Sequence, residues 1–576
     1  MWTFTNKENL NGGNYSKTIL GNKYAYHMCD STGLQSKGEI KWIYCGHVFL
    51  RGYKNHNIQK LPTTELLDVL YSEHKEAFIH QIKGNFIVIR IEKNSFSIYS
   101  DRFAIKKFFY WQSGKEFIIS NDLKEITRNI NATLSKENIA KYAVTYHFTN
   151  GSTAFANIRH NEPGQIIEFK EGELHHYKYW QPQDLLELRK RHVPISEIAE
   201  ALSKAVDLGL EHIDKSKVSL SLTGGADTRN LLAVFLKKGI SPHLYTYGDP
   251  ESDDCIKAKT IADGLGLAHQ IHDIQMTASL FEEYARKIIR QGGGLASIHR
   301  AHRIMAVERE KEFAENMFLG TLGGEFIKGV SEDDYIVPSI VYENWENQNY
   351  SLENLLEITQ KKFILPKKVD FDILLSIVKN EPYMKGDVIN RKVAALSFIT
   401  AHLHDAQDIN LYCNLMNDVF TPFLDIDYLE IVFSSQYTFD NKEKVKNKYL
   451  KRLINPVYAS HFIKSTYPPL LQFLYSGDHK PSDVLFNKYY AAFMKIIRKR
   501  KTKGRYKPNF PLNGWMEEFV QKNLPLCYNY KELYETFDLD ALMRELKTEN
   551  HKPKESYWLR FTNPIMMRFI IEEYNR

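Results

Sequence analysis

The sequence predicts an α/β protein with two parts: a strand-rich N-terminal region, then a parallel sheet with helices on both faces. Up to about residue 180, short runs of β-forming residues such as Phe86–Ile91 are separated by Gly, Asn and Lys. From about Ile195, apolar strands alternate with helical patterns in β-α-β-α-β order, which is typical of a parallel sheet. The length of 576 residues also exceeds the roughly 250–300 residues at which single cores stop growing.

Composition narrows the class of protein. The hydrophobic share of 43% and charged share of 25% are those of a soluble globular protein, and a net charge of +6 is too small to indicate nucleic-acid binding. No stretch approaches the roughly 18 apolar residues of a membrane span, and the first residues lack the pattern of a signal peptide. Five scattered cysteines indicate free thiols. We therefore expect a cytoplasmic protein with no membrane partner.

The N-terminal region is expected to be mostly β-structure. A helical segment over 135–146 interrupts it, a charged helix is expected to begin at Gln181, and the boundary between the two parts is placed between 180 and 195. The strands are expected in three short β-forming runs and one turn-then-strand unit: Ile40–Leu50, Phe86–Ile91, Phe96–Tyr99 and Asn161–Phe169.

The second part opens with the segment that organises the chain. Val218–Leu222 reads as a buried strand, Thr223–Asp227 breaks it with two glycines, and a helical pattern runs from Thr228 to near Gly239. Such a loop lets backbone N–H groups approach an anion at the positive end of a helix. Asp227 could hold magnesium and the threonine hydroxyls could bind phosphate. The alternative is an ordinary glycine turn.

Two further strands follow in the same pattern. His243–Pro250 includes Tyr247, a helix capped by Ser252 comes next, and Leu265–His272 leads into a third strand. A later apolar strand, Asn316–Gly329, also runs into a glycine loop. Because ligands of open parallel sheets bind at the carboxyl ends of the strands, these loops are the expected site.

The motifs resemble, in order, those of asparagine synthetase-like proteins. Thr223–Thr228 is similar to the Ser-Gly-Gly-x-Asp-Ser loop of enzymes that cleave ATP between the α and β phosphates. The other matching segments are Gly84–Phe86, Ser100–Tyr110, Glu162–Gln165, Asp253–His269, Pro422–Asp425 and Asn447–Pro469. The resemblance implies a glutamine amidotransferase-like αββα sandwich over 1–185. It also implies a doubly wound ATP pyrophosphatase domain with a helical C-terminal extension over 195–576.

One departure concerns the N-terminal domain. In the family's working glutaminases a cysteine follows the initiator methionine, whereas here position 2 is Trp2, and Cys29 and Cys45 lie too far along to replace it. The resemblance therefore implies a retained fold without glutaminase activity. β-lactam synthetases and lasso-peptide cyclases, which also lack this nucleophile, join an amine that is already present on a substrate.

The resemblance also implies the site residues. Lys464 and Glu325 are the catalytic candidates, and Asp227 is the magnesium ligand. Glycines of the second loop match the family, but Thr321 and Gly324 stand where an acidic or tyrosine residue and a magnesium-binding Asp are usual, and Asp418 and Phe420 replace a Glu and an Arg. The ATP-binding candidates are Leu222, Thr223, Gly224, Gly225, Asp227, Thr228, Tyr247 and Gly320.

The implied function is an ATP- and Mg²⁺-dependent ligase that adenylates a small-molecule or peptide carboxylate and passes it to an amine. The substrate would belong to specialised metabolite, peptide or glycan modification. The alternatives are an asparagine synthase-type enzyme using ammonia from a partner, a tRNA-modifying enzyme, and a non-catalytic nucleotide-binding scaffold. The protein could form a homodimer, and we do not expect it to bind nucleic acid.

Three further segments have no role in the implied ligase function. The basic stretch Lys495–Lys507 is either a solvated helix end or a docking surface for an anionic substrate, a carrier or an acidic peptide. His402 and His404 beside Asp405 and Asp408 could suggest a metal site, but a structural role is favoured. Tyr557–Tyr574 is expected to be a helix that packs on the second domain.

Overall fold

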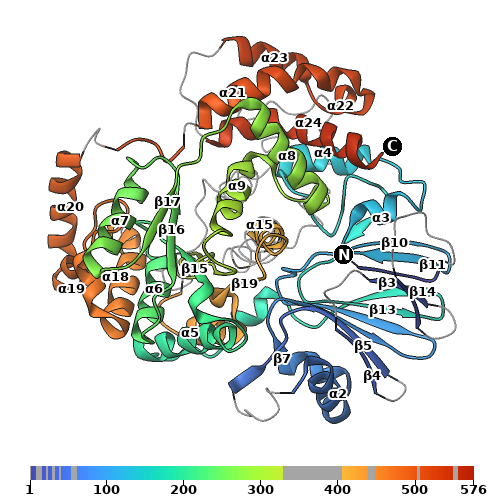
Figure 1. The fold of residues 1–576 in the computed structure, drawn as a ribbon, viewed down its shortest axis with the longest axis horizontal. Helices are drawn as coiled ribbons and strands as arrows, with labels where there is room; N and C mark the ends of the chain where they lie inside the picture. The colour runs from blue at the N-terminus through green and yellow to red at the C-terminus, as the bar shows by residue number, and fades with distance from the viewer. Residues whose placement is uncertain are drawn as a thin grey trace, which may run out of the picture.

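The computed structural model describes residues 2–7, 16–20, 24–28, 33–37, 40–53, 61–328, 393, 402, 405–438, 448–502, 506–510, 512–548 and 555–575. Two antiparallel sheets form the N-terminal part, and a parallel sheet surrounded by helices forms the rest (Figure 1). The predicted α/β class is therefore confirmed. Residues 330–390, His404, Cys29 and Gly329 lie outside the described residues.

Each antiparallel sheet has six strands. The first has the order β12 (Arg159–His160), β10 (Phe109–Ser113), β11 (Glu116–Ser120), β1 (Trp2–Thr5), β3 (Tyr24–Met28) and β2 (Ser16–Leu20). The second has the order β14 (Glu173–Lys178), β13 (Gln165–Lys170), β9 (Phe96–Ser100), β8 (Phe86–Ile91), β5 (Ile40–Gly46) and β4 (Gly33–Lys37). A small ladder pairs β6 (Phe49–Leu50) with β7 (Ile82–Lys83).

Side-chain alternation in β8 shows how the layers stack. Ile87, Ile89 and Ile91 join a core that also contains residues of β1, β10 and β11 in the first sheet. Phe86 and Val88 point the other way, into a core shared with α2 (Thr63–His74). Since strand residues alternate between faces, the two sheets pack face to face, with α2 outside the second. The helix α3 (Leu123–Thr127) packs on β10 and β11 of the first sheet, which gives the αββα order, and α4 (Lys136–Thr145) packs on C-terminal helices.

The third sheet is entirely parallel. Its order is β17 (His269–His272), β16 (His243–Tyr247), β15 (Val218–Ser221), β18 (Asn316–Phe318) and β19 (Asp418–Phe420). The chain builds from β15 outward to β17 and then returns to the other side of β15 with β18. The strand order therefore reverses between β15 and β18, which is the position where open α/β sheets bind ligands.

Helices flank this sheet in two groups. α5 (Ile195–Leu210), α6 (Asp227–Lys237), α16 (Ile426–Ser434) and α18 (Lys448–Thr466) contact one another, and α8 (Ala278–Gly292), α9 (Ala301–Glu310) and α15 (Ala406–Tyr412) form the second group. α7 (Asp253–Leu265) packs on β16, and the predicted Ser252 cap is confirmed, since its side chain accepts from the Cys255 N–H at 3.3 Å. None of the helices within the described residues is long and apolar enough to cross a membrane.

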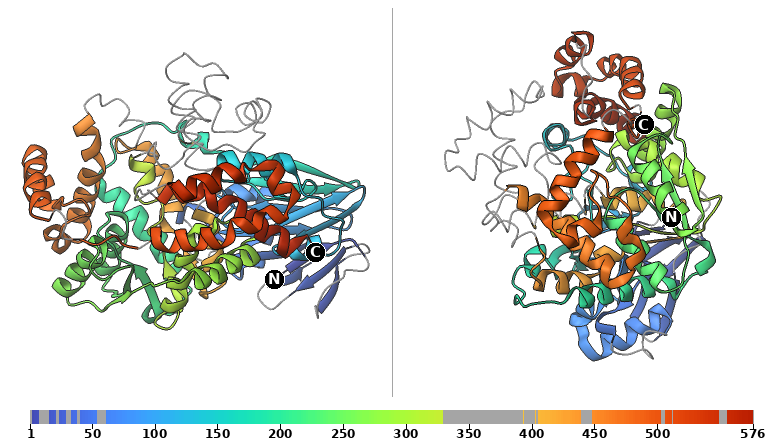
Figure 2. Two further views of the ribbon diagram at one scale, coloured as in Figure 1. Left: turned by 90° about the horizontal axis from the view of Figure 1, so that it is seen from above. Right: turned by 90° about the vertical axis from the view of Figure 1, so that its left-hand side faces the viewer.

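The C-terminal helices form two groups. α19 (Pro481–Phe486) and α20 (Lys488–Thr502) extend from α18, and α21 (Leu512–Asn523), α22 (Lys531–Thr536), α23 (Leu539–Thr548) and α24 (Glu555–Tyr574) form the second group. In Figure 2 the second group spans the two parts of the molecule. Tyr142 of α4 donates to Met566 Sδ at 3.1 Å and Tyr574 donates to the Ile289 carbonyl at 2.7 Å. The predicted C-terminal helix thus contacts both parts, not the second alone.

The charged helix predicted from Gln181 is wrong. Only a 3₁₀ helix over Pro182–Leu185 forms, and α5 begins at Ile195. The intervening charged residues bond elsewhere: the Lys190 ammonium donates to the Phe433 carbonyl at 2.6 Å and the Arg191 N–H donates to the Ser434 carbonyl at 2.8 Å. These bonds to the end of α16, together with the restriction that Pro194 places on the residue before it, favour an extended chain. The two domain ranges stay predictions.

Candidate functional site

The loops that follow β15 and β18 meet at the carboxyl edge of the parallel sheet. A Cβ built on Gly320 would lie 3.1 Å from the Thr228 backbone nitrogen and 3.2 Å from its Cα. A Cβ on Gly323 would lie 2.8 Å from the Asp227 Cβ. The second loop therefore touches the first turn of α6 directly, and only glycine allows this approach. The structure brings together Asp227, Thr228 and Gly320, which sequence reasoning had placed in one site.

The predicted strand, loop and helix are confirmed, since β15 ends at Ser221 and α6 begins at Asp227. Leu222 is fully buried; its N–H donates to the Tyr245 carbonyl at 2.8 Å, and its carbonyl accepts from the Thr246 hydroxyl at 2.6 Å. The Gly225 N–H donates to Thr223 Oγ1 at 3.0 Å. These bonds fix the loop to the neighbouring strand, so its shape is set before any ligand arrives.

Asp227 begins α6, where the helix dipole favours negative charge. Burial is the main cause that raises the pKa values of Tyr428, Tyr458 and Tyr475, and the Asp227 charge adds to the increase in each. The carboxylate thus lies among three tyrosines. Next to it, Thr228 Oγ1 is buried and makes no hydrogen bond within the described residues. A buried hydroxyl without a partner beside a glycine loop is free to bond to a ligand that enters the loop.

A segment that sequence reasoning missed covers this loop. The fully buried Arg229 donates to the Phe473 carbonyl at 2.9 Å and the Leu474 carbonyl at 2.7 Å, and its guanidinium lies 4.3 Å from the centre of the Tyr475 ring. Burial lowers the pKa of Arg229 to about 10. The backbone N–H of Ser476 donates to the Gly224 carbonyl at 2.6 Å. The only hint in the sequence is Gly477, which adopts a φ of +77°.

Gly224 is held from a second side by Asp254. Its N–H donates to Asp254 Oδ1 at 3.3 Å, the same oxygen that accepts from Ser476 Oγ at 2.9 Å. Asn509 Nδ2 donates to Asp254 Oδ2 at 2.8 Å. A carboxylate oxygen therefore lies where the loop N–H points, which is the position that a phosphate oxygen takes in an anion-binding loop. The acidic pair was expected from the sequence, but its contact with Gly224 was not.

Two cations lie against the loop, and neither is the predicted one. Besides Arg229, the buried Lys257 places its Cδ 3.1 Å from a Cβ built on Gly224, and its ammonium contacts Asp253 at 2.7 Å and Asp478 at 3.2 Å. Lys464 instead lies on the exposed face of α18, one turn after His461. Within the described part of the chain, Lys464 makes no hydrogen bond or ion pair with the loop.

The loop after β18 contains a conformation that the sequence did not reveal. The buried Leu322 adopts a φ of +65°, which is unfavourable for a residue with a side chain. Glu325 is half-buried at the start of α10 (Glu325–Lys328), and the next residue, Phe326, anchors this helix in the core. Gly324 is buried and supplies no carboxylate. The strain at Leu322 is of the kind that is retained at binding sites.

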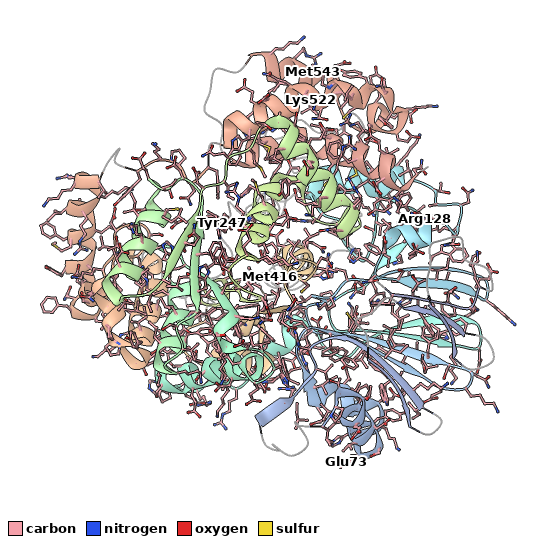
Figure 3. The ribbon with its side chains drawn as sticks, viewed as in Figure 1. Glu73, Arg128, Tyr247, Met416, Lys522 and Met543 are labelled. Carbon is pink, nitrogen blue, oxygen red and sulfur yellow. The ribbon has the colours of Figure 1, made fainter. Side chains whose placement is uncertain are left out.

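Tyr247 ends β16 at the same edge of the sheet and is labelled in Figure 3. Its ring stacks on Phe510 with the ring centres 5.8 Å apart, and it lies 6.5 Å from the ring of His302. Phe510 follows Asn509, which bonds to Asp254. Tyr247 therefore belongs to an aromatic cluster beside the loop, and it makes no hydrogen bond to the loop within the described residues.

The other residues singled out in the sequence, the possible metal ligands and Phe420, contact residues of the protein core. His402 Nδ1 lies 2.6 Å from the buried Lys107 ammonium, and Asp408 contacts Arg300 at 2.5 Å and Arg303 at 3.0 Å. Phe420 is buried and stacks on Phe318 at 4.8 Å. A cavity of about 780 Å³ lies away from the loop, between α5, α16 and the short helices η1 (Arg51–Tyr53) and η2 (Lys75–Gln81).

Comparisons with known proteins agree with the domain architecture. Residues 37–180 match the model of a glutamine amidotransferase domain. The chain is 25% identical over 269 residues to a putative asparagine synthetase [glutamine-hydrolyzing] 2 of Methanocaldococcus jannaschii, covering 44% of this chain and 51% of the relative. It is 27% identical over 211 residues to asparagine synthetase [glutamine-hydrolyzing] 2 of Bacillus subtilis, covering 33% of this chain and 28% of the relative.

The chain spans about half the length or less of these curated relatives. Among solved structures, a glutamine phosphoribosylpyrophosphate amidotransferase of B. subtilis overlaps 52% of this chain and 68% of its own at 10% identity, with a TM-score of 0.20. That overlap is too poor to support any argument. The chain thus contains a glutamine amidotransferase-type domain and is a distant homologue of asparagine synthetases.

Proposed function

We propose that this protein is an ATP-dependent ligase that activates a carboxylate as its adenylate, releases pyrophosphate and forms an amide. The observation that supports it most directly is the meeting of the two glycine loops at the switch point of the parallel sheet. There the first turn of α6 presents backbone N–H groups and a Thr228 hydroxyl that has no hydrogen bond to any residue the structure describes. Distant homology to asparagine synthetases, which form such a bond, agrees with this chemistry.

The residues at the loop fit a magnesium–nucleotide ligand. Asp227 would hold the ion, which would neutralise the leaving pyrophosphate, and a single protein carboxylate suffices because Mg²⁺ keeps several waters and phosphate ligands. Thr223, Gly224, Gly225 and Thr228 would bind the phosphates. Leu222, Gly320 and Tyr247 would surround the nucleoside. Lys464 and Glu325 stay proposed catalytic groups, with Lys257 a buried cation close to the loop.

We infer that the amine does not come from the chain's own glutaminase domain. The Trp2 side chain is 3% exposed in the core between the two antiparallel sheets, 6.1 Å from the Phe108 ring. The backbone N–H of Trp2 donates to Asn121 Oδ1 at 2.7 Å. Among the described residues no cysteine lies on β1. The amine would then belong to a second substrate in metabolite, peptide or glycan modification, or be free ammonia supplied by a partner.

The test is an assay of ATP with candidate carboxylic acids and amines that detects AMP and pyrophosphate. We expect AMP and pyrophosphate from the wild type, none from Asp227→Asn, and no glutamate when glutamine is the only amine source. Formation of ADP, or unchanged turnover by Asp227→Asn, would exclude the proposed chemistry. Release of glutamate from glutamine would overturn the inference about Trp2.

One observation favours a second candidate, a nucleotide-binding scaffold without turnover. Both backbone polar groups of Gly224 are already bonded, to Asp254 and Ser476. A loop that is closed by its own chain could bind nucleotide without reacting. Calorimetry with a non-hydrolysable ATP analogue separates the two: binding without AMP formation for any acid tested would favour the scaffold.

A further inference from the structure

The helix α20 (Lys488–Thr502) has its polar face against the protein. Lys495 Nζ lies 2.9 Å from His479 Nε2, Arg498 forms an ion pair with Asp483, and the Thr502 hydroxyl donates to Asp478 Oδ2 at 3.3 Å. Positions 491, 495, 498 and 502 are spaced by three or four residues, and Ala491 is buried. One stripe of the helix therefore fixes it to the segment 478–483, largely through polar bonds.

The opposite face of α20 is aromatic and exposed. Tyr489, Phe493 and Ile496 follow the same spacing and are 68%, 61% and 54% exposed. Phe486, at the end of α19, is 78% exposed and makes an edge contact with Tyr490 at 5.4 Å. These five side chains, which we call the α20 stripe, are half of the ten large apolar side chains exposed in the described chain. The helix thus inverts the usual pattern of apolar side chains inside and polar ones outside.

Strong positive charge accompanies the stripe. Residues 488–507 contain nine Lys or Arg and no Asp or Glu. Lys499, Arg500 and Lys501 are exposed in the last turn of α20, directly beyond Ile496. Arg498 and Lys507 form ion pairs with Asp483 and Glu251, so the exposed cations at the end of α20 carry the local charge. Apolar surface next to these cations fits an anionic partner with an apolar interior. Net charge over the whole chain is only +6, so this is a local concentration and not a general property.

We propose that α20 docks on the anionic surface of a lipid bilayer, with the α20 stripe in the headgroup region and the cations on the lipid phosphates. A helix with aromatic side chains on one face and adjoining Lys and Arg is the kind that lies in a membrane interface. Figures 1 and 2 place α20 at an outer edge of the molecule, so a flat surface can approach it. A partner protein of this chemistry would need an apolar groove with an acidic rim.

This proposal is independent of the enzymatic one and compatible with the finding that no helix among the described residues could cross a membrane. A helix that lies on the membrane surface does not need to span it. The sequence-based expectation of no membrane partner rested on the lack of a spanning segment, and it did not consider surface binding. α20 also bonds to Asp478 and His479, which lie two and three residues after Ser476, and Ser476 bonds to Gly224. Docking would therefore place the candidate site beside the membrane surface.

The experiment is sedimentation of the full-length protein with sucrose-loaded vesicles of pure phosphatidylcholine, and of phosphatidylcholine with 30 mol% phosphatidylglycerol. We expect binding to the anionic vesicles that weakens as salt is raised, and at least tenfold weaker binding to the neutral ones. Removing three cations in Lys499→Gln, Arg500→Gln, Lys501→Gln should weaken binding by about fivefold for each cation. Phe493→Ser with Ile496→Ser should abolish it while the cations remain.

Two control variants remove an exposed aromatic side chain or an exposed cation from another helix. Tyr534→Ser removes an aromatic side chain that is 43% exposed on α22, and Lys531→Gln removes a cation whose side chain is 81% exposed. Both should bind vesicles like the wild type, and thermal melting followed by circular dichroism should show every variant folded. No vesicle binding by the wild type, or equal binding by the stripe variant, overturns the proposal. If the wild type self-associates without binding vesicles, and only the Phe493→Ser, Ile496→Ser variant loses this self-association, α20 is a contact between copies of the chain.

Discussion

The ammonium of Lys83 lies 2.8 Å from Asp425 Oδ2, across the boundary between the antiparallel sandwich and the parallel-sheet part. Asp427 holds the same ammonium from the other side at 2.7 Å, and Lys83 is only 1% exposed. Asp425 also caps α16 by accepting from the Asp427 and Tyr428 N–H groups at 3.0 and 3.1 Å. One buried cation therefore joins the short strand β7 of the N-terminal part to the start of a helix beside the candidate site.

Replacing Lys83 by methionine should weaken the contact between the two parts. The substitution leaves two buried carboxylates without their shared cation, although Arg51 still contacts Asp427 at 3.0 Å. Breaking a buried pair of this kind costs about 3–5 kcal/mol. Urea unfolding should show this loss. The control is Lys204→Met, which removes an exposed ion pair with Glu200 and should cost about 0–1 kcal/mol. Equal effects of the two substitutions would show that Lys83 does not hold the parts together.

Gly320→Ala should disrupt the candidate site through space alone. The new methyl group would lie 2.6 Å from Thr228 Cγ2 and within about 3.2 Å of two backbone atoms of α6 that cannot move independently. We expect a loss of about 1–3 kcal/mol in unfolding free energy and a larger loss of nucleotide affinity. Gly514→Ala, in α21, meets open space and should raise stability by about 0.5–1 kcal/mol. Unfolding curves and calorimetry measure both; an unaltered nucleotide affinity in Gly320→Ala would remove Gly320 from the site.

The local elements of the candidate site could be predicted from the sequence. Strand, glycine loop and helix follow one another from Val218 to Lys237, and periodicity locates each of them. The parallel sheet was also predictable, because its strands alternate along the chain with helical patterns, whereas the sandwich was expected from the family resemblance of the N-terminal motifs. The strand predicted over Ile40–Leu50 ends at Gly46 and resumes as a separate short strand at Phe49, and the helix predicted from Gln181 does not form.

The long-range parts could not be read from the sequence. Ser476 bonds to Gly224 across 252 positions and Asn509 bonds to Asp254 across 255, and no local pattern marks either pair. Leu322 looks like a core residue, and no local pattern marks its positive φ. Lys464 matched a family position, but helix α18 continues through it, so its side chain is exposed. Tertiary contacts decided each of these cases.

Thr228→Val tests whether the unpartnered hydroxyl serves a ligand. Valine has nearly the same shape, and Thr228 Oγ1 has no hydrogen bond to lose within the described residues. We therefore expect unchanged or slightly higher thermal stability, together with nucleotide binding weaker by about ten- to hundredfold, since a hydrogen bond to a charged group contributes about 1.5–3 kcal/mol. Calorimetric titration with an ATP analogue measures the affinity. A destabilised variant with normal affinity would mean that the hydroxyl has a structural role.

Acidification should destabilise the fold through His302, which lies in the aromatic cluster with Tyr247 and Phe510. Burial is the main cause that lowers the pKa of His302 to about 3, and the charges of Arg303 and Arg300 lower it further. The unfolded chain takes up this proton near pH 6.5, so the stabilisation is complete above that pH and is lost as the pH falls toward 3. One such group contributes a slope of about 1.4 kcal/mol per pH unit.

The His302→Phe variant should flatten this dependence, because phenylalanine keeps a ring against Phe510, whose centre lies 4.5 Å from that of His302. Urea unfolding of both proteins between pH 7 and pH 4.5 gives the two slopes. His74, whose side chain is 40% exposed, supplies the control, since His74→Phe should leave the slope unchanged. If His302→Phe retains the full wild-type slope, the buried neutral histidine is not a source of acid sensitivity. In that case the loss must come from other buried groups, such as His160, whose pKa is lowered to about 4 by burial and by Lys107.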